Sequence, residues 1–111
     1  MLVFFRSKKL QKICSSSKDM QKAFGASRAR RLQQRLLELR AADNLSQISR
    51  LPPPRCHEMT GNRHGQISVD LDHPYRLFFI PANAPFPRRE DGGLDWEAVT
   101  EIEIVEIEDP H

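Results

Sequence analysis

Residues 66–80 read QISVDLDHPYRLFFI, and this stretch decides the fold. Polar and apolar side chains alternate from Gln66 to Asp70, which is the two-residue period of a strand with one buried face. Residues 72–74, Asp-His-Pro, predict a turn. Residues 75–80 are nearly all apolar, which is typical of a central strand. The stretch therefore predicts two neighbouring strands of a mainly antiparallel sheet.

Two more strands are expected nearer the N-terminus. Residues 56–59 alternate in the same way and are followed by a Gly-Asn-Arg-His-Gly turn at 61–65, so they predict the other half of a hairpin. Residues 2–5, Leu-Val-Phe-Phe, combine aromatic and β-branched side chains and predict a short buried strand. The sheet is thus expected to include both strands of the hairpin and the strand at the beginning of the chain.

The C-terminal segment predicts a loop and a last strand. Prolines and glycines between 81 and 95 predict a long loop, followed by one helical turn at 95–98. Residues 101–108 read EIEIVEIE, in which glutamate and isoleucine alternate until the phase slips at Val105. Such a slip predicts a bulge or a change of exposed face within the strand.

The N-terminal half has the period of helices. Ser7 is a suitable cap for a helix that runs to Cys14, and a longer helix is expected from about Lys18 to Ala42. Gly25 predicts an interruption of that helix, with Ser27 as the new cap. The apolar line expected to pack on the sheet consists of Ala29, Leu32, Leu36 and Leu39.

Three prolines at 52–54 separate the helical half from the strands, because proline lacks the amide donor and clashes with a preceding helical turn. A last turn is expected at 45–50. The predicted architecture is an α+β domain in which an N-terminal strand and two helices pack on a mainly antiparallel twisted sheet. A chain of 111 residues has the size of one domain, 1–111.

Composition excludes several classes of protein. Hydrophobic residues make up 39% of the chain, which is enough for a core, but no apolar run approaches the ~18 residues of a membrane span. The first residues place a short apolar stretch before the first positive charge, which is the reverse of a secretory signal. We therefore expect a cytoplasmic protein that makes no contact with membranes.

The cysteines and histidines do not predict a metal or thiol site. Cys14 and Cys56 are expected to be reduced structural thiols. Cys56 and His57 are adjacent in a strand, so their side chains would point to opposite faces, which disfavours a cysteine nucleophile. The chain has neither metal-ligand spacing nor a glycine-rich phosphate loop, so no metal and no cofactor are expected.

Charge is distributed unevenly. Residues 1–50 contain twelve Lys and Arg against three acids, a net +9, whereas residues 51–111 contain five Arg against twelve acids, a net −7. Two explanations of the basic half stay open: it binds a polyanion, with nucleic acid as the leading class, or it is the solvated side of a helix. The RNA-binding candidates are Lys8, Lys9, Lys12, Arg28, Arg31 and Arg35.

A family resemblance appears in the second half. Residues 55–70, RCHEMTGNRHGQISVD, with HPYRLFF at 73–79 and EDGGLDW at 90–96, resemble the HigB-like plasmid maintenance killer proteins of the RelE/ParE toxin superfamily. The N-terminal half resembles the same proteins in its pattern, a short strand followed by an arginine-rich helix. The resemblance implies a RelE/ParE-like fold and a toxin of a type II toxin–antitoxin system. Such a toxin binds the ribosome, cleaves translated mRNA, and is held inactive by a cognate antitoxin, here a HigA-like helix-turn-helix protein.

RNA cleavage without a metal needs a group that removes the 2′-hydroxyl proton, cations that neutralise the phosphoryl oxygens, and a proton donor for the leaving oxygen. Histidine and arginine suit these roles. Arg76 is a charge in an otherwise apolar strand, so it must face a polar cleft or an ion partner, and the resemblance implies contact with the scissile phosphate. A strand histidine is by itself more often packed or superficial, but the resemblance implies catalytic roles for His57 and the terminal His111.

Two positions depart from the family pattern. Thr60 stands where many relatives have lysine, and Pro110 stands where they have tyrosine before the final histidine. Either Arg63 in the hairpin turn supplies the missing charge, or cleavage is weak or lost. The catalytic candidates are thus His57, Arg63, Arg76 and His111, expected to converge in a cationic pocket. The alternative is a noncatalytic ParE-like protein that acts on a protein target or mainly in an antitoxin complex.

Overall fold

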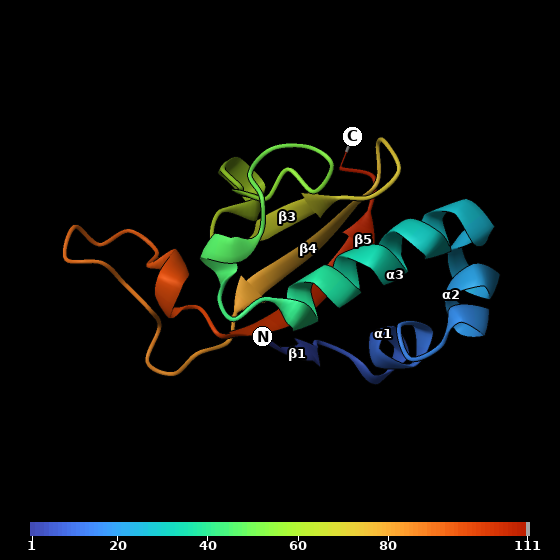
Figure 1. Ribbon diagram of the computed structural model, residues 1–111, viewed down its shortest axis with the longest axis horizontal. Coiled ribbons are helices and arrows are strands. Elements are labelled where there is room, and N and C mark those ends of the chain that lie inside the picture. The colour runs from blue at the N-terminus through green and yellow to red at the C-terminus, as the bar shows by residue number, and fades with distance from the viewer. Residues whose placement is uncertain (111) are drawn as a thin grey trace.

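The computed structural model describes residues 1–110, in which three α-helices pack on one mixed sheet of five strands (Figure 1). The helices are α1 (Lys8–Ile13), α2 (Ser17–Phe24) and α3 (Ala26–Ala41), and the strands are β1 (Leu2–Phe5), β2 (His57–Glu58), β3 (Ile67–Asp70), β4 (Arg76–Pro81) and β5 (Glu101–Glu108). Single 3-10 turns are η1 (Leu45–Gln47), η2 (Gly61–Arg63) and η3 (Trp96–Ala98). The α+β class and the arrangement of helices on a sheet are confirmed.

The strands lie in the order β1-β5-β4-β3-β2. The pairs β2–β3, β3–β4 and β4–β5 are antiparallel, and β1 lies parallel to β5 at one edge. The strand predicted as central, β4, does occupy the middle of the sheet. Because β1 pairs with the last strand, the beginning and the end of the chain are held together by one ladder.

The break in the long helix is confirmed at Gly25, but the expected cap is wrong. Gly25 itself precedes α3 with φ 83° and ψ 164°, a conformation that side chains rarely adopt. Ser27 lies inside the first turn of α3, and no side chain caps this helix. Ser7 caps α1 as predicted, and Ser16 caps α2; each accepts a hydrogen bond of 3.1 Å from the amide three residues later. No helix of the described chain combines the length and the apolarity that a bilayer crossing requires.

The side of the sheet that faces the helices is apolar. Its buried residues include Ile67, Val69, Leu77, Phe79, Ile102 and Ile104, which pack with the predicted helical line of Ala29, Leu32, Leu36 and Leu39. The register of β4 and β5 shifts once, since Phe78 pairs with Glu106 but Phe79 pairs with Ile104. The predicted phase slip at Val105 is therefore a β-bulge.

The long loop between β4 and η3 extends from one end of the molecule (Figure 1). Its base is held by Asn83, whose side-chain oxygen accepts hydrogen bonds from the amides of Thr100 and Glu101. Its far end is held by Trp96, whose indole donates to Glu58 at 3.0 Å while Arg50 stacks on the ring. The loop and the single turn after it agree with the prediction.

Candidate functional site

The face of the sheet opposite the helices carries the candidate site, and we call it the open face. One row across it follows the register from His57 through Ser68 and Phe78 to Glu106. A second row, two residues along, contains Asp70, Arg76 and Glu108. Cross-strand neighbours share a face, so His57 and Arg76 lie on the same side of the sheet. His111 lies outside the described residues.

His57 is oriented by the backbone. Its Nδ1 lies 3.0 Å from the carbonyl oxygen of Arg55. A carbonyl oxygen only accepts hydrogen bonds, so Nδ1 must carry the hydrogen, and in the neutral ring Nε2 is then left with a free lone pair. The half-buried imidazole thus has one nitrogen fixed and the other suited to accept a proton.

The Arg55 backbone is itself held by an ion pair. Arg55 adopts φ 46°, an uncommon value for a residue with a side chain. Its guanidinium donates two hydrogen bonds to the carboxylate of Asp70, at 2.7 and 2.9 Å. The side-chain hydrogen bond to Asp70 raises the pKa of Arg55 above its ordinary value. This bidentate pair fixes the carbonyl that orients His57.

Arg63 lies over the middle of the open face. Its guanidinium stacks on Phe78, 3.7 Å from the ring centroid. It also donates to Gln66 at 3.0 Å and to Glu106 at 3.1 Å, and it forms a further ion pair with Glu108. The Arg63 side chain is 19% exposed to solvent. Arg63 therefore lies in the candidate site, where the carboxylates of Glu106 and Glu108 on β5 hold its guanidinium.

Arg76 lies between two acids. Its Nε is 3.7 Å from the carboxylate of Asp70, and its cross-strand neighbour on β5 is Glu108. From the strand spacing, the Cα atoms of Arg76 and His57 are about 12 Å apart. The register places the two side chains on the same open face. The sequence left a polar cleft or an ion partner as explanations for a charge in this apolar strand, and the structure shows an ion partner, Asp70.

The expectation of a cationic pocket is wrong for the free protein. Arg55, Arg63 and Arg76 each have a carboxylate partner on the open face, and the acids involved are Asp70, Glu106 and Glu108. The physical reason is the bulge at Val105, which turns both glutamates at the end of β5 toward the arginines. A phosphate that enters the site must compete with these carboxylates.

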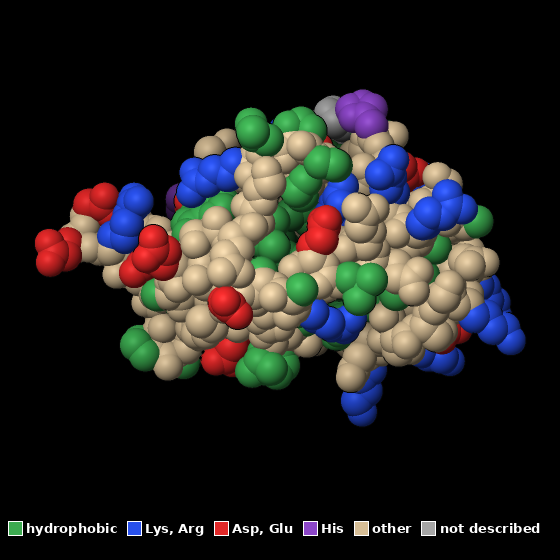
Figure 2. Space-filling view, in the orientation of Figure 1, with side chains coloured by type: hydrophobic (Ala, Val, Ile, Leu, Met, Phe, Trp, Pro, Cys, Tyr) green, Lys and Arg blue, Asp and Glu red, His purple; other side chains and the backbone are tan. Residues whose placement is uncertain are grey.

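The predicted RNA-binding residues divide into exposed and structural ones. Lys8, Lys9 and Lys12 on α1 and Arg31 on α3 are exposed. Figure 2 shows Lys and Arg side chains gathered over the end of the molecule that α1, α2 and the start of α3 form. This basic end also includes the exposed residues Lys18, Lys22 and Arg30.

Arg35 corrects the prediction, because its side chain is 2% exposed and cannot dock on RNA. Its Nε donates to the carbonyl oxygen of Asp70 at 2.7 Å, and its Nη1 donates to Glu38 at 3.0 Å. Arg28 is half-buried, because it pairs with Asp72 at 3.0 Å and stacks on Tyr75. Both arginines attach α3 to the end of β3 and the turn that follows it, so they support the site from behind.

The two cysteines are buried thiols. Burial raises the pKa of Cys14 to about 11 and that of Cys56 to about 12, so both are protonated at neutral pH. Cys56 is fully buried, whereas the neighbouring His57 lies on the open face. This arrangement agrees with the prediction that the two do not form a nucleophilic pair.

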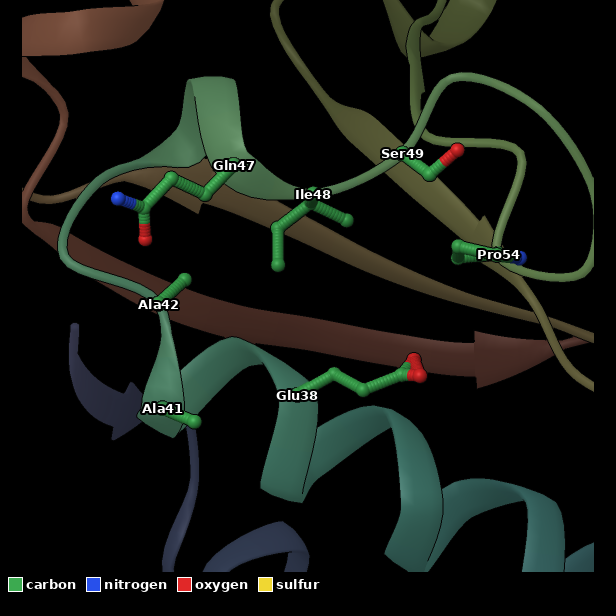
Figure 3. Close-up of a pocket in the computed structure, with 7 residues that line it drawn as sticks. All are labelled: Glu38, Ala41, Ala42, Gln47, Ile48, Ser49 and Pro54. Atoms are coloured by element: carbon green, nitrogen blue, oxygen red, sulfur yellow. The ribbon is translucent and has the colours of Figure 1, made fainter.

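A cavity of about 430 Å³ lies on the other side of the molecule, between the end of α3 and the segment that follows it (Figure 3). Its walls are Ala41, Ala42, Ile48 and Pro54, with the polar groups of Glu38, Gln47 and Ser49 at the rim. Of the predicted site residues that the structure describes, none lines it. Within residues 1–110, no cluster of three His, Cys, Asp or Glu side chains could hold a metal ion.

Comparisons of the chain with models of protein families and with curated protein sequences gave no match.

Several residues of the open face were not identified from the sequence. They are Ser68, Asp70, Phe78, Glu106 and Glu108. The phase slip at Val105 was the available signal for the two glutamates, since it assigns them to the same face as Arg76. Ser68 and Phe78 gave no chemical signal, because each looks like an ordinary strand residue.

Proposed function

We propose that this protein is the toxin of a type II toxin–antitoxin system and acts in the cytoplasm as a ribosome-dependent, metal-independent mRNA endoribonuclease. The observation that carries the proposal is the placement of His57, Arg63 and Arg76 on one open face of the sheet. The family resemblance of residues 55–79 supports the same assignment. A HigA-like antitoxin is its proposed protein partner.

In the proposed reaction, Nε2 of His57 takes the proton of a ribose 2′-hydroxyl. The 2′-oxygen then attacks the adjacent phosphorus, the bond to the 5′-oxygen breaks, and a water molecule donates the proton that the leaving 5′-oxygen takes up. Arg63 and Arg76 neutralise the charge that develops on the phosphoryl oxygens. Proton transfer by one positioned group typically contributes about 10²–10⁴-fold to the rate.

The decisive experiment maps mRNA 5′ ends in a reconstituted translation system to which the purified protein is added. New 5′ ends within translated frames are expected with the wild-type protein. His57→Ala and Arg76→Ala should lose these ends while still sedimenting with ribosomes. If the wild-type protein creates no new ends, or if both variants cleave as it does, the proposal is wrong.

Docking on ribosomal RNA is assigned to the basic end. Replacing Lys8, Lys9, Lys12 and Arg31 by glutamine should weaken ribosome binding and reduce its salt dependence, by roughly one slope unit for each phosphate that is no longer neutralised. Arg88 and Arg89 are exposed in the long loop at the other end, so their double glutamine variant is the control. Equal weakening in the two variants would contradict the assignment.

One observation favours the noncatalytic alternative. Arg55, Arg63 and Arg76 are each paired with a carboxylate, so the open face offers few unpaired cations among the described residues. A protein of this kind would arrest growth through a protein target, or act mainly in an antitoxin complex, and would leave mRNA intact. The same map of 5′ ends separates the two functions.

A further inference from the structure

We propose that Phe78 and Ser68 form a binding site for one nucleobase, and that the guanidinium of Arg63 occupies this site in the free protein. The identification of RNA as the natural ligand rests on the proposed function. The base site itself follows from three features of the open face: the ring of Phe78, the hydroxyl of Ser68 and the contacts of Arg63.

The Phe78 ring is placed as an aromatic platform. Phe78 is fully buried, yet it does not belong to the cluster of side chains beneath the helices, because it lies on the open face. The group that covers it is the guanidinium of Arg63, 3.7 Å from its centroid. A flat group stacked at this distance occupies the position that a nucleobase takes on an aromatic side chain.

The Ser68 hydroxyl has no hydrogen-bond partner among the residues that the structure describes. Ser68 is fully buried, and its Oγ forms no hydrogen bond within the described part of the chain. Buried hydroxyl groups in folded proteins are nearly always hydrogen-bonded. Ser68 lies directly between His57 and Phe78 in the cross-strand row. A base stacked on Phe78 brings its polar edge to this hydroxyl, which can both donate and accept.

Arg63 is held by groups that a nucleotide can replace. Its partners Glu106 and Glu108 are carboxylates, and a phosphate offers a guanidinium the same paired oxygens. The turn that carries Arg63 is bounded by Gly61 and Gly65, both with positive φ. We infer an exchange in which Arg63 moves from the carboxylates to the phosphate while the base takes its place on Phe78.

The test titrates adenosine, which is uncharged, into the protein and follows binding by NMR, with ribose as the control ligand. Arg63→Ala should bind adenosine on the order of 10-fold more tightly than the wild-type protein, since the competing guanidinium is gone. The double variant Arg63→Ala with Phe78→Leu should lose that gain, with circular dichroism as the check on its fold. If Arg63→Ala binds adenosine no better than wild type, or binds ribose equally well, the base site is wrong.

A second titration uses adenosine 5′-monophosphate and two matched pairs of substitutions on β5. Glu106→Gln with Glu108→Gln releases Arg63 and should tighten binding several-fold. Glu101→Gln with Glu103→Gln makes the same change of charge on the same strand without touching Arg63, and should have little effect. Equal tightening in both pairs would overturn the exchange.

Failure of this inference is distinguishable from failure of the proposed function. Cleavage of ribosome-bound mRNA without adenosine binding to Arg63→Ala would overturn the base site alone. Adenosine binding without any new mRNA ends would remove the nuclease and leave the base site.

Discussion

Arg35 provides the sharpest test of the structure, because the sequence placed it on an RNA-binding surface and the structure places it in the interior. We predict that Arg35→Ala lowers the free energy of unfolding by about 3–5 kcal/mol, the sum of a lost hydrogen bond to the backbone and the lost packing of the stem. The partner carboxylate of Glu38 is 36% exposed, so the ion pair itself adds little to this decrease. Part of this decrease comes from the carbonyl of Asp70, which accepts from Nε at 2.7 Å and would be left unpaired, at about 1–3 kcal/mol. The rest comes from the methylene stem, at about 0.8 kcal/mol per buried group.

The measurement is urea denaturation followed by circular dichroism. With an m-value of about 2 kcal/mol per molar, the midpoint of Arg35→Ala should fall by roughly 2 M. Arg35→Met keeps the stem but not the hydrogen bonds, so its decrease in stability should be confined to about 1–3 kcal/mol. Arg31→Ala is the matched control, one turn earlier and exposed, and should change stability by less than about 0.5 kcal/mol.

Two results would refute this reasoning. One is a decrease below about 1 kcal/mol in Arg35→Ala, which would mean that the side chain is not held as described. The other is an equal decrease in Arg31→Ala, which would mean that any charge removed from α3 has the same effect. The functional corollary is that Arg35→Ala should also disturb Arg76, because both arginines contact Asp70.

Three further predictions concern the thiols, the bulge and the tryptophan. The thiols of the unfolded chain lose their protons near pH 9, whereas burial in the folded protein raises the pKa of Cys14 to about 11 and that of Cys56 to about 12. The free energy of unfolding should therefore fall as the pH rises above 9, by about 1.4 kcal/mol per pH unit for each thiol. Replacing Cys56 by alanine should remove its share of the slope in urea melts, and an unchanged slope would contradict the assignment. Val105 is the extra residue of the bulge, so deleting it leaves a strict alternation of glutamate and isoleucine in which Glu106 still pairs with Phe78 and both later glutamates stay on the open face. The deletion variant and Val105→Ala should therefore both give a native circular dichroism spectrum, and an unfolded deletion variant would disprove the register. Trp96→Phe loses the hydrogen bond to Glu58 and should cost about 1–2 kcal/mol in urea melts, with Glu58→Gln, which keeps an acceptor, nearer to wild type; a neutral Trp96→Phe would show that this hydrogen bond does not anchor the loop.

The elements themselves were largely predictable. Hydrophobic period is a local property, so the helices, the strands and the slip at Val105 could be read along the chain. The cap of α3 was not predicted correctly, because a serine is the common choice, whereas here the backbone turns at Gly25 with φ 83°. The parallel pairing of β1 with β5 joins residues about a hundred positions apart, which no local pattern specifies.

The candidate site was predictable in its residue types and less so in its electrostatics. His57 and Arg76 were identified from the motif, and the register places them on one face. The sequence could not say that Arg63 stacks on Phe78, or that it pairs with glutamates more than forty residues away. Residue type and helical spacing do not distinguish an exposed arginine from a buried one. Arg35 was therefore wrongly predicted to lie on the RNA-binding surface.

The sequence alone determined the α+β class, the basic and acidic halves, the phase slip at Val105 and the identity of the candidate histidine and arginines, because periodicity, charge and motif are written in consecutive residues. Only the tertiary structure decided which charges neutralise one another, since ion pairing depends on distances between segments that are remote in the chain. The folding of η2 over the sheet brings Arg63 to Phe78, next to the buried Ser68 hydroxyl, which finds no hydrogen-bond partner within residues 1–110.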